Sequence, residues 1–421
     1  MPPGFHRLIA AQFASALADN ALLIVTIALL AERQLPPWWA PLLKLSFTLS
    51  YVLLAPFVGP AADAMPKARL MAWMNGVKLL GVVALIAGLH PVAAFAIVGF
   101  GAATYAPAKY GLITELVPAE RLVAANGWVE VSVVCAALLG TGLGGLLVSP
   151  WMLHGALATA LRPFGPDATA GLAGSPLTAS LALLLGVYAA AAGLNRGVPD
   201  SGARYRSRGL HPGTLLRDFL QAQRTLWRDP QGGLSLAVTT LFWGVGATLQ
   251  FAVLRWSAER LRLSLDGGAY LQAAVALGVV GGAAMAGRWV ALARAPQMLA
   301  AGVALGLLMP VVAACTSLAW AVALLVGVGI VGGLLVVPLN ALLQHRGAQL
   351  MSAGRSVAVQ GASENASVLA MLAVYAVLTA ADVPIVALMQ GFGLAIAAAM
   401  TALIARERLR RRRQPAGRRA A

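Results

Sequence analysis

Apolar segments, each long enough to cross a lipid bilayer, follow one another along most of this chain. The first runs from Gln12 to Leu30, close to the roughly 20 residues that a transmembrane helix needs. Of the 421 residues, 59% are hydrophobic and only 11% are charged, whereas soluble domains carry about 25% charged residues. The sequence therefore predicts an all-α integral membrane protein.

Twelve such segments can be placed along the sequence. They fall near residues 8–31, 42–62, 70–89, 92–112, 123–148, 176–194, 234–256, 268–292, 297–316, 319–343, 355–380 and 383–405. A segment rich in Pro and Gly, Pro150 to Ser175, lies between the fifth and the sixth. Its part from Trp151 to Leu161 is a candidate for a short interfacial helix.

The net charge of +16 is concentrated in a loop from Arg196 to Arg228 and in the tail from Arg406 to Arg419. Basic residues collect on the cytoplasmic side of membrane proteins, so this distribution predicts that both termini are cytoplasmic. No RNA- or DNA-binding motif accompanies the charge, which favours contact with anionic lipids over nucleic acid. Cys135 and Cys315 lie in apolar runs and predict neither a disulfide framework nor a metal site. No cofactor is expected.

Weak internal similarity accompanies the long basic loop, which separates six spans from six. The segment F-A-S-A-L-A-D-N-A-L-L of the first span can be laid on L-F-W-G-V-G-A-T-L-Q (241–250) of the seventh. Parallel repeats of this kind build the major facilitator fold, with substrate bound between the halves. We therefore predict twelve transmembrane helices in two six-helix halves. The predicted divisions are an N-terminal half (1–195), a basic cytoplasmic linker loop (196–233), a C-terminal half (234–405) and a basic tail (406–421).

The adjacent pair Asp19-Asn20 lies near the middle of the first span. A carboxylate at the bilayer centre costs about 2.5–3.5 kcal/mol on insertion scales, and buried membrane charges usually face a cavity or pair with one another. Any one polar residue inside a span can simply stabilise helix packing, but together they indicate a substrate cavity. The other candidates for substrate binding are Lys78, Lys109, Tyr110, Asn126, Glu130, Gln250, Asn340, Gln344, Glu364 and Asn365.

A second polar group follows the second span. Asp63 ends the segment G-P-A-A-D, and Lys67 and Arg69 come shortly after it. The pattern resembles the loop G-x-x-x-D-[RK]-x-G-[RK] of the facilitator superfamily, although Ala64 follows the aspartate. It predicts a charge latch, in which ion pairs between these residues gate the cytoplasmic helix ends. The alternative is a cytoplasmic turn whose positive charges only set the membrane topology.

Ordered blocks also resemble one family. The segments A-Q-F-A-S-A-L-A-D-N-A-L-L, N-G-V-K-L-L-G, Y-A-P-A-K-Y-G, A-A-N-G-W-V-E and V-V-P-L-N-A-L-L-Q, with the final V-Q-x-x-x-E-N, are similar to the bacterial lysophospholipid transporters. The resemblance implies a monomeric inner-membrane transporter that flips lysophosphatidylethanolamine and related lysolipids from the outer to the inner leaflet. There a partner acyltransferase/acyl-carrier-protein synthetase restores the second chain.

One departure concerns Gln250, because the family carries an arginine at this place in the seventh span. Arg255 lies five residues on, which turns a helix by about 140°, so it does not replace that side chain. A zwitterionic headgroup needs a carboxylate for its ammonium and a cation for its phosphate. Asp19 with Glu130 or Glu364 suits the first role. Lys109 or Lys78 suits the second, and Lys109 is the favoured balancing cation for Asp19.

Two other classes of protein are alternatives to a lysolipid transporter. A facilitator that exports another small amphiphile or a drug has the same composition and stays open. An embedded acyltransferase is disfavoured because none of the five histidines has an aspartate five residues later. No G-x-x-x-x-G-K-[ST] phosphate loop is present either, which argues against direct coupling to ATP. The sequence thus predicts a transporter, not an enzyme.

Overall fold

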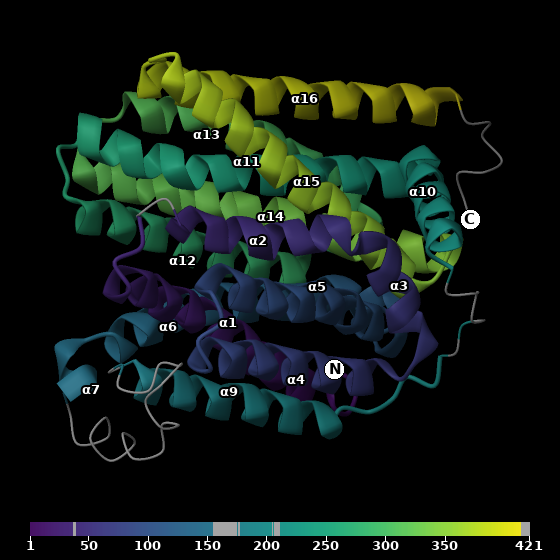
Figure 1. Ribbon diagram of the computed structural model, residues 1–421. Coiled ribbons are helices and arrows are strands. Elements are labelled where there is room, and N and C mark those ends of the chain that lie inside the picture. The colour runs from purple at the N-terminus through teal and green to yellow at the C-terminus, as the bar shows by residue number, and fades with distance from the viewer. Residues whose placement is uncertain (37–38, 155–174, 176, 204, 206–210, 414–421) are drawn as a thin grey trace. The chain divides into compact units, whose positions relative to one another are not determined.

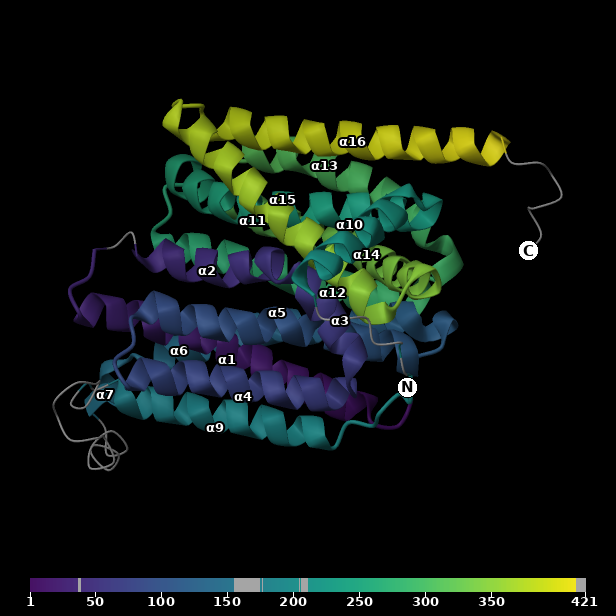
Figure 2. The same ribbon diagram turned by 45° about the vertical axis from the view of Figure 1, so that its right-hand side comes forward.

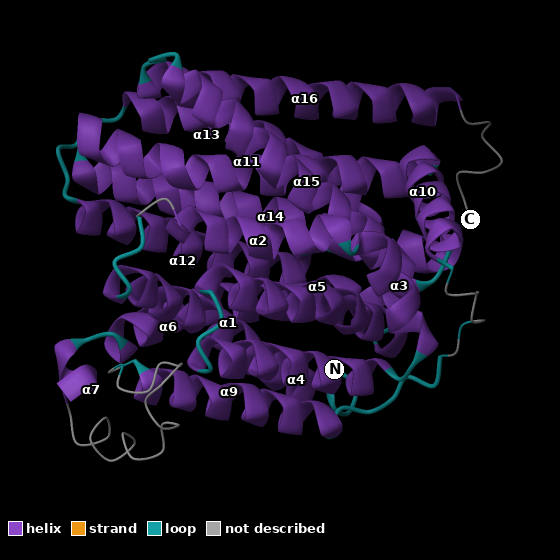
Figure 3. Ribbon diagram, in the orientation of Figure 1, coloured by secondary structure: helices purple, strands orange, loops and turns teal. Residues whose placement is uncertain are grey.

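The computed structural model describes residues 1–36, 39–154, 175, 177–203, 205 and 211–413. Within these residues every regular element is helical (Figure 3). The longer helices are α1 (Phe5–Glu32), α2 (Trp39–Leu53), α3 (Ala55–Ala64), α4 (Lys67–Ile86), α5 (Pro91–Leu116), α6 (Leu122–Leu147), α9 (Thr178–Arg196), α10 (Pro212–Arg228), α11 (Pro230–Arg260), α12 (Leu265–Trp289), α13 (Leu299–Ala314), α14 (Leu318–Leu350), α15 (Ala353–Ala380) and α16 (Ile385–Arg413). The shorter ones are α7 (Pro150–His154) and the 3₁₀ turns η1 (Ala119–Arg121) and η3 (Leu292–Met298).

Among the described residues, 11 helices are long and apolar enough to cross a membrane, and the bent pair α2 and α3 brings the number of spans to as many as 12. The predicted multi-pass all-α fold is confirmed. The second predicted span, 42–62, is broken, because α2 and α3 meet at 65°. Pro56 lies in the first turn of α3, where its missing amide interrupts the helical hydrogen-bond ladder.

The two predicted linkers differ from expectation in detail. α7 covers only the start of the predicted interfacial helix, and the rest of that segment lies outside the described residues. The predicted basic linker loop contains the 17-residue helix α10. Leu215, Ala222 and Leu226 are its buried positions, and their spacing places them on one face. The sequence did not predict α10, because the surrounding arginines lower the mean hydropathy of the segment that carries this apolar stripe.

Contacts divide the chain into two compact units. Unit 1 comprises Met1–Pro118, Ser132–Leu226 and Gly347–Asn365. Unit 2 comprises Ala119–Val131, Trp227–Arg346 and Ala366–Ala421. The start of α6 therefore belongs with unit 2 and the start of α15 with unit 1, while the boundaries at 195 and 234 stay a prediction.

In unit 1, α4 lies beside α5 and α9, α1 beside α9, and α2 along α5 (Figure 1 and Figure 2). Its apolar core includes Leu22, Leu43, Phe95 and Tyr188. Because Tyr188 is fully buried among these side chains, its phenol is held at a fixed place inside the unit.

In unit 2, α13 packs along α16, and α11 contacts α12 and α16. α12 and α14 approach so closely that a Cβ atom on Gly278 would lie 2.2 Å from the carbonyl oxygen of Val326, and one on Gly329 would lie 2.1 Å from that of Val275. Small residues permit such contacts between membrane helices, where van der Waals packing replaces the hydrophobic effect. This packing fixes one wall of the cavity described below.

Candidate functional site

One face of α1 carries the polar side chains of unit 1. Gln12, Ser15 and Asp19 are spaced three and four residues apart, so they lie above one another on the helix. Gln12 and Ser15 are each 2% exposed and Asp19 is 16% exposed. The polar stripe is therefore turned toward α4, α5, α6 and α9, away from lipid.

Asp19 is paired. Its Oδ2 atom lies 2.7 Å from Nζ of Lys78 on α4, and its Oδ1 atom accepts a hydrogen bond of 2.7 Å from the Tyr188 hydroxyl on α9. Lys78 also donates to Ser15 Oγ at 2.9 Å, and Ser15 in turn donates to Asn75 Oδ1 at 2.7 Å. This ion pair compensates for placing a carboxylate in the middle of a span.

A second chain of contacts starts at Lys109 on α5. Its Nζ atom donates to Gln12 Oε1 at 3.0 Å, and Gln12 Nε2 donates to Ser132 Oγ on α6 at 2.8 Å. The same ammonium lies 4.1 Å from the centroid of the Tyr110 ring, a favourable cation–π distance. Lys109 is thus held on the same polar stripe, and it is 8% exposed.

The expectation that Lys109 balances Asp19 is wrong, because Lys78 makes the ion pair. The reason is helix packing: α4 presents Asn75 and Lys78, three residues apart, to the face of α1 that carries Ser15 and Asp19. Lys109 meets the same face further toward the N-terminus, at Gln12. The two lysines therefore serve two different places on one polar stripe.

Several predicted binding residues bond within their own helices. The Asn20 amide donates to the Ala16 carbonyl oxygen and that of Asn365 donates to the Gly361 carbonyl oxygen, each at 2.8 Å. Glu364 accepts a hydrogen bond of 2.8 Å from Gln360, one turn earlier on α15. The structure does not bring Asn20 into the Asp19–Lys78 network.

Five predicted binding residues belong to unit 2, namely Asn126, Glu130, Gln250, Asn340 and Gln344. Asn126 and Gln344 form a reciprocal amide pair with two hydrogen bonds of 2.9 Å. Asn340 and Glu130 are each 6% exposed, and Asn340 lies one turn before Gln344 on α14. Each of the two side-chain amides thus donates one hydrogen bond to the other and accepts one from it. Such a pair stabilises helix packing, which is the alternative to substrate binding.

Gln250, also in unit 2, lines a cavity of about 110 Å³ enclosed by α11, α12, α13, α14 and α16. Apart from Gln250 and Gln272, the lining side chains are apolar or glycine. Gln272 Nε2 donates to the main-chain oxygen of Gln250 at 2.6 Å. Gln250, which stands where the family carries an arginine, therefore lies beside apolar side chains.

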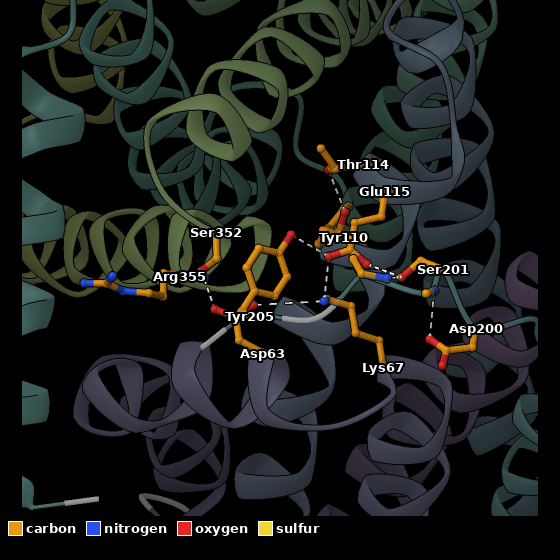
Figure 4. Close-up of polar contacts among 12 residues, drawn as sticks. Asp63, Lys67, Tyr110, Thr114, Glu115, Asp200, Ser201, Tyr205, Ser352 and Arg355 are labelled. Carbon is orange, nitrogen blue, oxygen red and sulfur yellow. Dashed lines mark hydrogen bonds and ion pairs between the residues drawn. The ribbon is translucent and has the colours of Figure 1, made fainter. Parts of the chain in front are cut away.

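Two of the three predicted gating residues, Asp63 and Lys67, lie in a separate group of unit 1 with Glu115, Ser201, Tyr205 and Ser352, which Figure 4 shows and which we call the Lys67 cluster. Lys67 Nζ lies 2.6 Å from Glu115 Oε1 and 4.0 Å from Asp63 Oδ1. The Ser352 hydroxyl, at the start of α15, donates to Asp63. A Cβ atom on Gly354 would lie 2.7 Å from Asp63 Oδ1, so only glycine permits this approach of α15 to α3.

The segment after α9 completes the Lys67 cluster. Ser201 donates to Glu115 Oε2 at 2.5 Å and Tyr205 donates to Glu115 Oε1 at 2.9 Å. The Lys67 ammonium lies 4.9 Å from the centroid of the Tyr205 ring. Burial, together with the hydrogen bond to Glu115, raises the pKa of Tyr205 above its usual range, so the phenol stays a donor at neutral pH.

Arg69 is not part of the Lys67 cluster. It is exposed and lines an open groove with Trp73 and Arg196. Because Lys67 lies two residues earlier on α4, the two side chains leave the helix about 200° apart. Of the predicted gating triad, the structure brings together Asp63 and Lys67 only.

Sequence reasoning missed several members of both networks. In the Asp19–Lys78 network these are Ser15, Asn75 and Tyr188, and in the chain of contacts from Lys109 they are Gln12 and Ser132. The spacing of Gln12, Ser15 and Asp19 was a usable signal, since it marks one helix face. Tyr188 and Glu115 carry no such signal, because their partners lie on helices remote in sequence.

The fold and the site can now be set against known proteins. The family model described as Major Facilitator Superfamily matches residues 8–363. The chain is 38% identical over 407 residues to "Lysophospholipid transporter LplT" of Shigella flexneri, covering 95% of each chain. It is also 38% identical to the protein of that name from Citrobacter koseri, covering 95% of this chain and 94% of the relative.

The chain belongs to the lysophospholipid transporter family of the Major Facilitator Superfamily. Among solved structures, the human organic anion transporter MFSD10 aligns with a TM-score of 0.69 at 16% identity, covering 96% of this chain and 99% of that one. A structure of the Escherichia coli fucose:proton symporter FucP gives a TM-score of 0.70 at 12% identity, with 96% and 98% covered. These two likenesses concern the fold alone.

Proposed function

We propose that this chain is a lysophospholipid transporter, which moves lysophosphatidylethanolamine and related lysolipids from the outer to the inner leaflet of a bacterial inner membrane. The observation that carries the proposal is the 38% identity over 95% of the chain to curated transporters of that name. A multi-pass helical protein with buried charges is the architecture that such transport needs.

The chemistry of the α1 stripe supports this substrate class. A lysophosphatidylethanolamine headgroup carries one ammonium and one phosphate, and the stripe offers a carboxylate and two ammonium groups, Asp19, Lys78 and Lys109. The substrate ammonium would exchange with Lys78 at Asp19, which frees Lys78 for the phosphate. Such an exchange keeps every charge paired, which a low-dielectric site requires.

The arrangement in the membrane is part of the proposal. Both termini face the cytoplasm, because the positive-inside rule places the loop 196–228 and the tail there. The protein works as a monomer by alternating access, with the lysolipid entering sideways from the bilayer, and it performs no covalent chemistry. An acyltransferase/acyl-carrier-protein synthetase then reacylates the product in the inner leaflet.

The Lys67 cluster is the proposed gate. Asp63 holds the start of α15 through Ser352. Lys67 and Glu115 hold the segment after α9 through Tyr205, and Glu115 also binds Ser201. Opening the gate breaks these contacts, so weakening them changes the rate of transport and leaves the selectivity unchanged.

The test is uptake of labelled lysophosphatidylethanolamine by spheroplasts that express this chain with an active reacylating partner. Spheroplasts with the partner and without the chain are the control. We expect uptake and reacylation that depend on the chain. Equal uptake in both preparations would reject the lysolipid assignment.

A further inference from the structure

We propose that the apolar cavity of unit 2 holds the end of the lysolipid acyl chain and that the buried side chains at its floor limit the chain length. This inference rests on the proposed function, since it assigns a subsite for the same substrate.

The cavity has a mouth and a floor. Gly246 and Gln250, one turn apart on α11, are exposed and form the mouth. The floor is built from fully or almost fully buried side chains of α13, α14 and α16. Met309 and Met400 are each 1% exposed, and Leu325 and Leu335 are 0% exposed. A chain end entering past α11 therefore meets a closed apolar wall.

The chemistry of the lining selects hydrocarbon. Only Gln250 and Gln272 contribute polar side chains, and a main-chain acceptor at Gln250 already occupies the Gln272 amide. A polar ligand would lose hydrogen bonds in such surroundings, which costs free energy. Bilayer tails are as apolar as leucine, so an acyl chain moves from lipid into this cavity at almost no cost.

The size of the cavity limits what it can hold. A dry engineered cavity of about 150 Å³ binds one benzene molecule, so about 110 Å³ accommodates a chain segment of roughly four carbons. The cavity thus takes the end of a long acyl chain and leaves the remainder at the mouth. Methionine at two floor positions adds adaptable packing, because its unbranched side chain fills irregular gaps.

Replacing Gly246 by a larger residue would narrow the mouth of the cavity. A Cβ atom added there meets nothing within 4 Å, so the side chain of Gly246→Leu starts in open space beside the cavity entrance. Gly327 on α14 is the matched control, because an added Cβ meets nothing within 4 Å there either and the residue does not line the cavity.

The experiment uses the full chain and a lysophosphatidylethanolamine that carries a photoreactive diazirine at the end of its acyl chain. After irradiation, mass spectrometry locates the labelled peptides. We expect label on the floor segments of α13, α14 and α16, displaced by unlabelled lysophosphatidylethanolamine. Gly246→Leu should lower this labelling about tenfold, the factor that corresponds to about 1.4 kcal/mol of lost binding, and Gly327→Leu should leave it unchanged.

A second readout is uptake of palmitoyl against decanoyl lysophosphatidylethanolamine. Gly246→Leu should reduce uptake of the palmitoyl form more than that of the decanoyl form, and Gly246→Ala should show a smaller change in the same direction. Label confined to lipid-facing residues or to unit 1, or equal behaviour of Gly246→Leu and Gly327→Leu, would overturn the inference. Loss of all uptake by the unaltered chain would instead reject the proposed function, so the two failures are distinguishable.

Discussion

The polar stripe of α1 and the cavity behind α11 occupy matching places in the internal repeat and have opposite chemistry. The segment 13–23 of α1 aligns with 241–250 of α11. Asp19 on α1 is paired with Lys78 and Tyr188, whereas α11 contributes Val245, Gly246 and Leu249 to an apolar cavity. In the proposed transport, these two regions serve the two ends of one amphiphile.

The difference also teaches how each region is stabilised. The α1 stripe depends on each charge meeting a partner, because an uncompensated buried charge is costly. The α11 cavity depends on shape and on the absence of polar groups. Substitutions should therefore act on the first region through charge pairing and on the second through volume.

The largest effect is expected from Lys78→Met, which leaves the Asp19 carboxylate without its cation. Breaking one side of a buried ion pair typically costs about 3–5 kcal/mol. The double variant Asp19→Asn with Lys78→Met should recover much of this loss and remain inactive in uptake. Thermal unfolding in detergent measures both, and a double variant no more stable than Lys78→Met would show that the pair is not coupled.

A smaller effect is expected from Gln250→Arg, which puts a cation at the mouth of the α11 cavity. It should raise uptake of lysophosphatidylglycerol, which has a net negative charge, relative to zwitterionic lysophosphatidylethanolamine. The ratio should change about tenfold, the factor that corresponds to about 1.4 kcal/mol, because the added cation attracts the net charge of a headgroup that passes the mouth. Competition between the two labelled lipids measures the ratio. An unchanged ratio would mean that the headgroup never passes this position.

The Lys67 cluster lies in unit 1 and is distinct from the α1 stripe, so it should control rate alone. Tyr205→Phe removes the hydrogen bond to Glu115 and keeps the ring beside Lys67. Because such a bond contributes about 1 kcal/mol, the uptake rate should change about fivefold with no change in lipid preference. Initial rates with two lysolipids test this, and altered preference would contradict a gating role.

The smallest effect concerns Asp229, which caps α11. Its Oδ2 atom accepts from the Gly232 amide at 2.7 Å, and its Oδ1 atom accepts from Arg346 at 2.7 Å. Although partial burial acts to raise it, these hydrogen bonds hold the pKa of Asp229 below its usual value. The stabilisation is therefore present above about pH 4 and is lost as pH falls through the lower folded-state value.

Asp229→Asn keeps an N-cap oxygen and loses the charge that pairs with the partly exposed Arg346, so it should cost about 0.5 kcal/mol at neutral pH and remove this contribution to the acid dependence. Melting temperatures at neutral and acidic pH measure both. The same acid dependence in the variant and in the unaltered chain would show that another group is responsible.

Much of the fold could be predicted because long apolar segments and the basic loop are properties of composition. The break between α2 and α3 and the amphipathic helix α10 could not, since a proline and an arginine-masked stripe alter local structure without changing average hydropathy. Asp19 was identifiable from its cost in a membrane. Its partner was not, because Lys78 and Lys109 differ only in which part of the α1 face each meets, and helix packing decides that.

Whether Asp19 receives the lysolipid headgroup can be measured by uptake of labelled lysophosphatidylethanolamine into spheroplasts expressing Asp19→Ala or Thr26→Val. Thr26 lies on the same helix, is buried, and donates to the Leu22 carbonyl oxygen one turn earlier. With equal amounts of inserted protein, we expect Asp19→Ala to abolish uptake and Thr26→Val to retain it. Normal uptake by Asp19→Ala would make Asp19 a structural partner of Lys78 and would contradict the account.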